Sequence, residues 1–425
     1  MKLKILLFTI TVTLSGQLWA SGFQVLLQGN RQTAMGNVGV SLNPDAYSLF
    51  FNPGGLGMME YNQISVGFNP IFSNNVFWNS QVENSNYTAE TDNPMGTPFH
   101  FYGVWGPQES NIKFGLGVYT PYGSGVNWGE DWIGRNVLEQ ISLQAIFIQP
   151  TVSYKLADWL SVGGGFVYAV GGVNLQRSLP IAAEGDPSVE LDGSANGVGY
   201  NVGMLLKAGD NFNFGISYRS RVDMEVSGGD ASFTAIPGAL AQFFPAGNTF
   251  DASLPLPSNL TFGATYFASD KFQVSAEANL VGWSAFDTLA FDFTTNTPQL
   301  ADSKSPRNYE NSWVFKLGGE YKLNDKIALR AGAYFDQTPV QAGYMTPETP
   351  DADRLGLTFG IGYNVSDKLS LDLSFLYIDG KERTQTFAEA STAGTYVPAV
   401  GRQDVIPGTY ELNAFIPGIS LNYKF

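Results

Sequence analysis

Few side chains in this sequence offer catalytic chemistry. The chain holds a single histidine, His100, and no cysteine, so a thiol nucleophile, a thiolate metal site and a histidine-rich metal centre are all excluded. No Gly-x-Ser-x-Gly elbow is present, and the glycines at 163–165 lie inside a predicted strand with no following helix to bind phosphate. Asp351 and Asp353 alone are weak evidence for a cation site. We therefore predict no enzyme, no metal and no cofactor, and expect His100 to be structural.

The composition narrows the class of protein further. Of the 425 residues, 14% are charged and 14% are aromatic, whereas soluble proteins have about 25% charged residues. There are 48 glycines, and the formal net charge of −15 leaves no strongly basic surface for a nucleic acid backbone. A chain that is rich in aromatic residues and glycine and poor in charge is not typical of a soluble enzyme.

The first 20 residues have the pattern of a secretory signal peptide. Lys2 and Lys4 form a basic start, residues 5–14 are apolar, and Ala20 is a small residue at a plausible cleavage point. The alternative is a buried N-terminal helix. Beyond this segment no run of about 18 consecutive apolar residues appears, so the mature chain is expected to have no transmembrane helix.

Apolar and polar residues alternate with a period of two in several segments, which predicts strands with two different faces. Residues 313–323 place Trp, Phe, Leu and Tyr on one face and Val, Lys, Gly and Glu on the other, and residues 212–226, 272–280 and 327–335 behave similarly. A soluble antiparallel sandwich would also alternate. Connection lengths decide against it, because tight turns at 157–158, 210–211, 270–271, 324–325 and 367–368 alternate with long polar loops.

This asymmetry predicts an all-β fold, a 14-stranded antiparallel transmembrane β-barrel in the bacterial outer membrane. The last strand alternates to a terminal Phe425, which is typical of such barrels. With an even number of strands, the start of the first strand and the end of the last strand both lie on the periplasmic side. The expected strands begin near Tyr61, Phe99, Ile112, Ile141, Leu160, Val198, Phe212, Leu256, Phe272, Ser312, Ile327, Leu355, Leu369 and Tyr410.

Residues 21–60 precede the first strand and do not alternate. They combine turn formers with many apolar residues that need burial, and the lumen of a 14-stranded barrel is wide enough to receive them. We therefore predict three parts: a signal peptide (1–20), an N-terminal hatch that plugs the lumen (21–60) and the barrel (61–425). The alternative for residues 21–60 is a periplasmic tail.

Several motifs resemble the FadL/TodX family of outer-membrane transporters of hydrophobic compounds. Ser21-Gly22-Phe23-Gln24 and the later run 45–56, which contains Asn52-Pro53-Gly54, resemble the hatch of that family, although the family usually has Ala at the place of Gly54. Further matches lie at 256–260, 282–286, 331–340 and 353–354. The resemblance covers essentially the whole mature chain.

The resemblance implies a transport route without a cofactor or an energy source. An apolar groove formed by the third and fourth extracellular loops captures a long-chain fatty acid or, in some members, an aromatic hydrocarbon. The ligand then moves to an internal pocket beside the hatch. A rearrangement of the hatch opens a lateral exit through the barrel wall, at an inward kink of the third strand.

The resemblance also suggests where the ligand binds. Arg177 at the end of the fifth strand is the first choice for a carboxylate, and the second cation is either Lys304 or Arg307; the alternative for each is an ordinary surface or lumen charge. Other lumen cations are expected to pair with acidic residues: Arg219, Arg221, Arg330 and Lys316 with Glu225, Glu277, Glu320 and Asp372.

Apolar and glycine positions complete the predicted site. Leu240, Phe243 and Phe244 lie on one side of an expected short helix in the connection 236–245 and form either the capture groove or packing against neighbouring loops. The expected residues of the remaining parts are as follows: Phe23 for ligand contact in the N-terminal segment, Asn52, Pro53 and Gly54 for a hatch turn, and Gly115 and Gly117 for the lateral gap.

The sequence thus predicts passive outer-membrane transport of long-chain fatty acids or similar hydrophobic molecules. Two alternatives remain: an uptake channel for monoaromatic hydrocarbons and a general diffusion porin. The expected partners are the hydrophobic ligand and outer-membrane lipid, with no nucleic acid, and the protein is expected to be a monomer.

Overall fold

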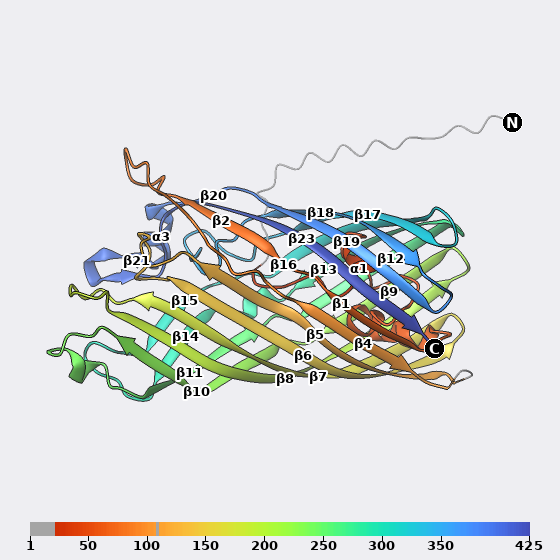
Figure 1. The fold of residues 1–425 in the computed structure, drawn as a ribbon, viewed down its shortest axis with the longest axis horizontal. Coiled ribbons are helices and arrows are strands. Elements are labelled where there is room, and N and C mark those ends of the chain that lie inside the picture. Colours follow the sequence, from red (N-terminus) through yellow and green to blue (C-terminus); the bar gives the residue numbers. More distant parts are fainter. Residues whose placement is uncertain (1–21, 108–109) are drawn as a thin grey trace.

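The protein folds into one elongated barrel of strands (Figure 1). The structure is a computed structural model that describes residues 22–107 and 110–425, so the predicted signal peptide lies outside the described residues. No helix within these ranges is long and apolar enough to cross a membrane.

Antiparallel pairing joins each strand to its neighbours around the barrel, and β1 pairs with β23 to close it. The barrel strands are β1 (Gln63–Phe68), β2 (Phe72–Trp78), β3 (Thr88–Glu90), β4 (Phe99–Trp105), β5 (Ile112–Asn127), β6 (Gln140–Ala157), β7 (Leu160–Ser178), β8 (Ser188–Ala208), β9 (Phe212–Arg219), β10 (Val222–Thr234), β11 (Asn248–Leu256), β12 (Asn259–Ser269), β13 (Phe272–Val281), β14 (Thr288–Phe293), β15 (Ser303–Pro306), β16 (Ser312–Lys322), β17 (Ile327–Asp336), β18 (Arg354–Asn364), β19 (Leu369–Gly380), β20 (Arg383–Gln385) and β23 (Gly408–Lys424).

Several of these strands share one path along the wall, which confirms the predicted 14-stranded barrel. The shared paths are β1 with β2, β3 with β4, β9 with β10, β11 with β12, β13 with β14, β15 with β16, and β19 with β20. Closure matters physically because a sheet edge in lipid would leave backbone groups without hydrogen-bond partners.

The wall follows the two-sided pattern that the sequence predicts. In β1, Ile64, Val66 and Phe68 are exposed on the outside, whereas Gln63 and Ser65 are buried in the lumen. Outward-facing aromatic and aliphatic residues cover the other strands in the same way, for example Phe359 at 58% exposure. An apolar exterior with a polar interior is the arrangement expected of a barrel in a bilayer.

The strands extend further at the loop end than the sequence predicts. The sixth strand begins at Ser188 instead of near Val198, the eighth begins at Asn248 instead of near Leu256, and the expected loop 295–308 contains β15. The alternating pattern fades there because strands that project into water no longer need an apolar face, although their backbones continue to pair. The connections 179–187 and 235–247 are correspondingly shorter.

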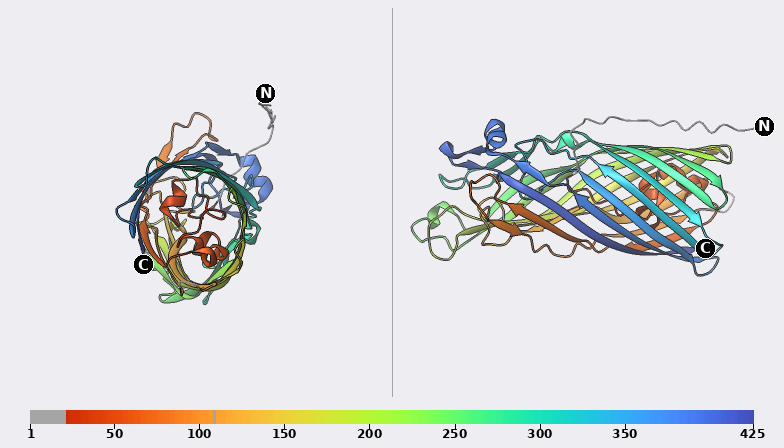
Figure 2. Two further views of the ribbon diagram at one scale, coloured as in Figure 1. Left: turned by 90° about the vertical axis from the view of Figure 1, so that its right-hand side faces the viewer. Right: turned by 90° about the horizontal axis from the view of Figure 1, so that it is seen from above.

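The helices are short and lie in two places. Within the barrel are α1 (Asn30–Thr33), α2 (Ser48–Phe51) and η1 (Pro53–Met58), all in the N-terminal segment, by which we mean residues 22–62; Figure 2 shows it inside the ring of strands. The remaining short elements belong to connections at the loop end: η2 (Ala241–Phe243), η3 (Trp283–Ala285), α3 (Phe387–Ala393), β21 (Tyr396–Val397), η4 (Pro398–Val400) and β22 (Arg402–Gln403).

The pairing of β5 with its neighbours is irregular at one point. Pairing with β4 ends at Tyr119, opposite His100, and the register with β6 shifts between Tyr119 and Tyr122. The shift coincides with Pro121, which has no backbone N–H to contribute to a ladder. Beyond it, β4 provides no partner for β5.

A charge on the lipid face tests the orientation of the wall. We expect Phe359→Arg, in the middle of β18, to lower the free energy of unfolding by about 2–4 kcal/mol, because the guanidinium would enter hydrocarbon. The measurement is reversible denaturant unfolding in lipid vesicles. As the matched control, Val365→Arg at the adjacent tight turn should cost only about 0–1 kcal/mol, since it lies near the interface. Equal costs at both positions would contradict the assignment.

Candidate functional site

An apolar cavity lies in the loop-end half of the barrel. Its lining comes from β6, β7, β8, β10, β11 and β14, together with Phe23 from the N-terminal segment and Phe286 after η3. Phe23 contacts Trp283 and Phe286 edge to face, with ring centroids 5.0 and 5.6 Å apart. The aliphatic and aromatic lining residues include Leu143, Val173, Leu175, Met224, Val226, Leu254, Leu256, Leu289 and Phe291.

One buried ion pair borders this cavity. Arg307 donates from Nη2 to Oε1 of Glu348 at 2.9 Å and from Nη1 to Oγ of Ser305 at 2.5 Å, and only 2% of Arg307 is exposed. Oε2 of Glu348 is buried without a hydrogen-bond partner among the described residues. The cavity is therefore a mainly apolar space with one neutralised cation at its edge.

A second cavity, of about 400 Å³, lies beside the first. The two share Phe23, Ser124, Leu143 and several other lining residues. The second cavity is bordered on one side by the chain segment 94–98 and residues 123–126 of β5, the part of β5 that β4 does not pair with. Most of the rest of its lining comes from the N-terminal segment and from β2, β6, β17, β18, β19 and β23. We refer to this unpaired part of the wall, between residues 94–98 and 120–126, as the gap.

The N-terminal segment supplies hydrogen bonds at the gap. Val25 donates its N–H to the carbonyl of Pro121 at 2.9 Å, and Gly123 donates to the carbonyl of Phe23 at 3.2 Å. The side chain of Gln28 donates to the carbonyl of Thr120 at 3.0 Å. Residues 23–28 thus take the place of a neighbouring strand at the point where β5 has lost one.

The predicted gap residues Gly115 and Gly117 lie elsewhere. They are in the regular part of β5, opposite Val104 and Tyr102 of β4. A side chain at either glycine would meet Leu49 of the N-terminal segment, at 2.7 and 2.6 Å. Their small size makes room for α2, and the irregularity lies further along β5, at residues 119–122.

Asn52, Pro53 and Gly54 form a turn in the N-terminal segment. The Asn52 side chain caps η1 by accepting from the Gly54 N–H at 3.1 Å and donates to the carbonyls of Val40 and Met204 at 2.7 and 2.9 Å. Only 1% of Asn52 is exposed. The motif holds the segment against β8 in this structure and does not line the apolar cavity.

The other two candidate cations lie away from the apolar cavity. Arg177 is half-buried near the end of β7, where the charges of Glu348 and Asp404 act on it. Lys304 in β15 is exposed, and its backbone carbonyl accepts from Arg402. Among the three cations predicted for a carboxylate, Arg307 is the one that borders the cavity.

The predicted capture residues pack among loops. Leu240, Phe243 and Phe244 surround η2, a single 3₁₀ turn, and Phe244 contacts Phe233 with centroids 5.3 Å apart. Leu240 and Phe243 are half-buried against the same apolar cluster that the 179–187 connection joins through Leu179 and Ile181. None of the three residues lines either cavity described above.

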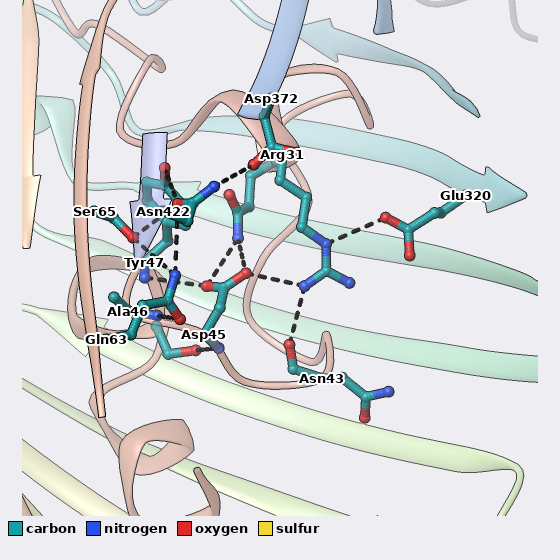
Figure 3. A network of polar contacts seen from close by, with 12 residues as sticks. Arg31, Asn43, Asp45, Ala46, Tyr47, Gln63, Ser65, Glu320, Asp372 and Asn422 are labelled. Carbon is teal, nitrogen blue, oxygen red and sulfur yellow. Dashed lines mark hydrogen bonds and ion pairs between the residues drawn. The ribbon is translucent and has the colours of Figure 1, made fainter. Parts of the chain in front are cut away.

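The tight-turn end of the N-terminal segment is held by a network of charges (Figure 3). Arg31 pairs with Asp45 at 2.9 Å and with Glu320 of β16 at 3.3 Å. Glu320 also pairs with Arg330 at 2.7 Å, and Arg330 pairs with Asp372 at 2.5 Å. The predicted pairing of Arg330 with these acids is thus present, and the network links the segment to three strands of the wall.

Two other predicted pairings have a different outcome. Lys316 lies 3.8 Å from Glu277, close enough for an ion pair but too far for a strong hydrogen bond. Arg221 is exposed and pairs with Asp223 rather than facing the lumen. Glu225 accepts a hydrogen bond from Ser253 and pairs with neither Arg219 nor Arg221 in the described residues.

Asp351 and Asp353 do not converge on a cation. Asp351 accepts from the Gly22 N–H at 3.0 Å and from Thr338 and Arg354, both at 2.5 Å, so it fixes the start of the N-terminal segment. Asp353 faces Lys381 at 3.9 Å, and burial raises the pKa of Asp353 to about 6. No group of three or more metal-binding side chains occurs in the described ranges.

Two features of the site escape the sequence reasoning. Glu348, which pairs with Arg307, lies in a polar loop where nothing marks it as buried. The irregularity of β5 did carry a signal, because Pro121 interrupts an otherwise regular strand pattern, and proline inside a strand indicates a bulge or an edge.

Comparison with known proteins identifies the family. A family described as outer membrane protein transport protein (OMPP1/FadL/TodX) matches residues 11–425. The chain belongs to the OMPP1/FadL/TodX family. An outer membrane protein of Neisseria meningitidis is 26% identical over 99% of this chain and 98% of its own length. The long-chain fatty acid transport protein of Salmonella typhi is 23% identical, over 87% of this chain and 89% of that protein.

Solved structures share the fold of this OMPP1/FadL/TodX protein. A FadL homologue of Pseudomonas aeruginosa aligns with a TM-score of 0.78 and 19% identity, over 95% of this chain and all of that one. The toluene transporter TodX of Pseudomonas putida aligns with a TM-score of 0.70 and 19% identity, covering 93% and 97%. The protein is therefore an outer-membrane β-barrel of a transport family and not an enzyme, as predicted.

Removing one charge from the network should loosen the N-terminal segment. Arg330→Met leaves Asp372 without a cation and Glu320 with one fewer, so we expect the free energy of unfolding to fall by about 3–5 kcal/mol. Denaturant unfolding in vesicles measures it. The exposed pair Arg221–Asp223 supplies the control, and Arg221→Gln should cost at most about 1 kcal/mol. A similar loss in both variants would argue that the network does not anchor the segment.

Proposed function

We propose that this protein carries long-chain fatty acids or similar hydrophobic molecules passively across the outer membrane, as a monomer. The observation that carries the proposal is the contact between two cavities. The apolar cavity shares lining residues with the second cavity, which extends to the gap, so an apolar molecule in the first cavity adjoins a space that borders the proposed exit. Mostly apolar pockets with a few placed polar groups are typical ligand sites.

The loops at the outer end are the proposed point of capture. Half-buried Leu240 and Phe243 and the residues Leu179 and Ile181 bring the third and fourth outer connections into one apolar cluster. An apolar surface of this kind in water favours contact with a hydrophobic ligand. From there the ligand passes down to the apolar cavity, with no energy source and no cofactor in the route.

The N-terminal segment is the proposed hatch, and the gap is the proposed lateral exit. Because residues 23–28 supply hydrogen bonds to Thr120, Pro121 and Gly123, they cannot leave without exposing these backbone groups. Movement of the hatch and opening of the wall are therefore one event in this proposal. Phe23 lines both cavities and contacts Phe286, so a ligand that displaces Phe23 would begin that movement.

A fatty acid brings a carboxylate, for which Arg307 is the proposed partner at the apolar cavity. Exchange of Glu348 for the ligand carboxylate would keep the buried cation compensated, and the released carboxylate of Glu348 would turn towards Arg177, on which its charge already acts. Arg177 and Lys304 remain candidates for attracting the head group nearer the surface. The family relative from Salmonella typhi is named a long-chain fatty acid transport protein, which supports this choice.

Monoaromatic hydrocarbons are the second candidate ligand. Arg307 is already neutralised by Glu348, so the apolar cavity needs no anion, and Phe23, Phe286 and Phe291 offer ring faces and edges to an aromatic molecule. A structural relative is a toluene transporter. A general diffusion porin is disfavoured because the N-terminal segment lies inside the lumen (Figure 2). A low single-channel conductance in planar bilayers would support this exclusion.

Ligand titration distinguishes the two candidates. We expect the purified protein to bind a long-chain fatty acid saturably, and Arg307→Gln to weaken this binding by about tenfold or more, because one charge-assisted hydrogen bond is lost. Toluene binding to the same variant should be unchanged. Identification of co-purified molecules by mass spectrometry supplies an independent check.

The control is Arg402→Gln, which removes an outer cation that lies away from the cavity and pairs with Asp404. Its fatty acid affinity should equal that of the wild type. Toluene binding without any preference for the acid would assign the protein to the hydrocarbon branch. Binding of neither ligand, together with high conductance, would overturn the proposal in favour of a porin.

A disulfide across the gap tests the lateral exit. The chain has no cysteine, and a side chain at Gly125 would lie 3.4 Å from Cγ of Pro94 on the other side of the gap. We expect Pro94→Cys with Gly125→Cys to block uptake of radiolabelled fatty acid by cells when oxidised and to allow it after reduction. The physical reason is that a covalent link prevents the two sides from separating.

The matched control links the chain segment that contains Pro94, between β3 and β4, to β2 instead of β5. Asn93 donates to Ser73 Oγ at 3.3 Å, so Ser73→Cys with Asn93→Cys adds a disulfide without spanning the gap. Uptake should then be independent of oxidation. If the oxidised Pro94–Gly125 variant transports as well as its reduced form, the exit lies elsewhere.

A further inference from the structure

Arg219 is a buried arginine without an acidic partner in the part of the chain that the structure describes. Arg219 ends β9, and only 6% of it is exposed. Arg31, Arg307, Arg330 and Arg354 each lie within 3.3 Å of a carboxylate oxygen, whereas no carboxylate lies within 4.0 Å of Arg219 in the described ranges. A buried cation without a counter-ion is costly, so its charge needs an explanation.

Neutral groups hold the Arg219 guanidinium in place. Nη1 donates to the hydroxyl of Tyr119 at 2.8 Å and to Oε1 of Gln149 at 3.1 Å, and Nη2 donates to the carbonyl of Phe50 at 2.9 Å. The guanidinium lies over the ring of Phe50, 4.4 Å from its centroid. Of the five N–H groups that an arginine carries, Nε–H and one on Nη2 lack a partner among these contacts.

Arg219 lines a small chamber between the N-terminal segment and the wall. Its other charged residues are Lys316 and Glu277, which balance each other at 3.8 Å, so the formal charge of the chamber is that of Arg219. The rest of the lining is mixed. Neutral donors and acceptors come from Gln24, Gln28, Asn37, Tyr122, Asn259 and Asn279, and apolar surface comes from Leu26, Val40, Phe50, Phe51 and Pro121. The chamber has the composition of a site for one small anion.

The chamber adjoins the cavity at the gap. Gln24 and Leu26 of the N-terminal segment line both spaces. Gln24 donates to Asn259 Oδ1 at 3.1 Å, and a shift of this side chain would join the two. An amphiphile whose tail occupies the cavity at the gap can therefore place its head group beside Arg219, on the side away from Arg307.

We propose that Arg219 binds the carboxylate of the transported molecule at a second, inner station. The ligand class is a long-chain monocarboxylate, and the inference rests on the proposed function. A carboxylate at Arg219 compensates the buried charge and uses the two free N–H groups. Arg219 also donates a hydrogen bond to the carbonyl of Phe50 in the proposed hatch. Binding of the anion to Arg219 would therefore act on the hatch through this hydrogen bond.

The test compares hexadecanoate with hexadecanol on the purified full-length protein. The wild type should bind the acid at least about tenfold more tightly than the alcohol. In Arg219→Gln the preference should fall markedly while affinity for the alcohol stays the same, and Arg219→Lys should restore part of it. Arg221→Gln, two residues further along and exposed, is the matched control and should keep the full preference. Arg307→Gln measures the outer station separately.

The outcomes separate this inference from the proposed function. Loss of affinity for acid and alcohol alike in Arg219→Gln would make Arg219 a structural residue and overturn the inner station. The inner station would also be overturned if Arg219→Gln kept its preference for the acid over the alcohol while Arg307→Gln lost it. That result would still support the transport role. Displacement of bound acid by an equal concentration of acetate would show a general small-anion site. Binding of neither hexadecanoate nor hexadecanol would reject the proposed function itself.

Discussion

The constraint on which this structure depends is that a wall in lipid must satisfy its own backbone hydrogen bonds. Fourteen paired strands meet it by closure, and β1 with β23 completes the ring. At the loop-end half of β5 the rule is met differently, since β4 stops pairing at Tyr119 and residues 23–28 of the N-terminal segment contribute partners instead. A stretch of β5 that lacks a neighbouring strand is thus also a place that the N-terminal segment covers. A lateral exit and a movable hatch need not be separate devices in such a barrel, because removing one strand-like segment accomplishes both.

The two ends of the N-terminal segment are held by interactions of different strength. Arg31 and Asp45 belong to a network of charges that reaches three strands, and breaking buried ion pairs by removing one partner costs several kcal/mol. Residues 23–28 are held by single neutral hydrogen bonds, each with a net value of about 1 kcal/mol. Motion confined to residues 23–28, with Gly22 still held by the Asp351 carboxylate, therefore breaks no ion pair, whereas release of the whole segment breaks those of Arg31. The charged network makes it reasonable that the segment stays attached while its first residues move.

The sequence predicts the fold well because the barrel rules act on every strand. Period-two alternation and the alternation of tight turns with long loops predicted the number of strands. The apolar residues of the non-alternating segment 21–60 predicted a place in the lumen, where residues 22–60 lie (Figure 2). The outer strand limits were missed, as at Ser188 and Asn248, because the alternating pattern has no physical cause beyond the bilayer. The residues of the site were harder to predict from the sequence than the fold. Among the residues predicted for the ligand, Phe23 and Arg307 line the apolar cavity, whereas Arg177 and Lys304 do not. The sequence carries no local sign of which side chains from 14 strands meet at one cavity. Pro121 was the one local signal of the irregular strand.

Charge compensation also explains why the lumen is divided. The space nearest the loops is apolar, with its one cation neutralised by Glu348, and an apolar tail gains most from leaving water there. The chamber beside Arg219 contains several polar side chains, and its cation relies on neutral oxygens. A molecule with an apolar tail and an anionic head therefore meets increasing attraction for its head group as it moves inward, whereas a hydrocarbon meets none. We therefore propose that the same apolar cavity can admit both kinds of molecule and that the chamber beside Arg219 discriminates between them.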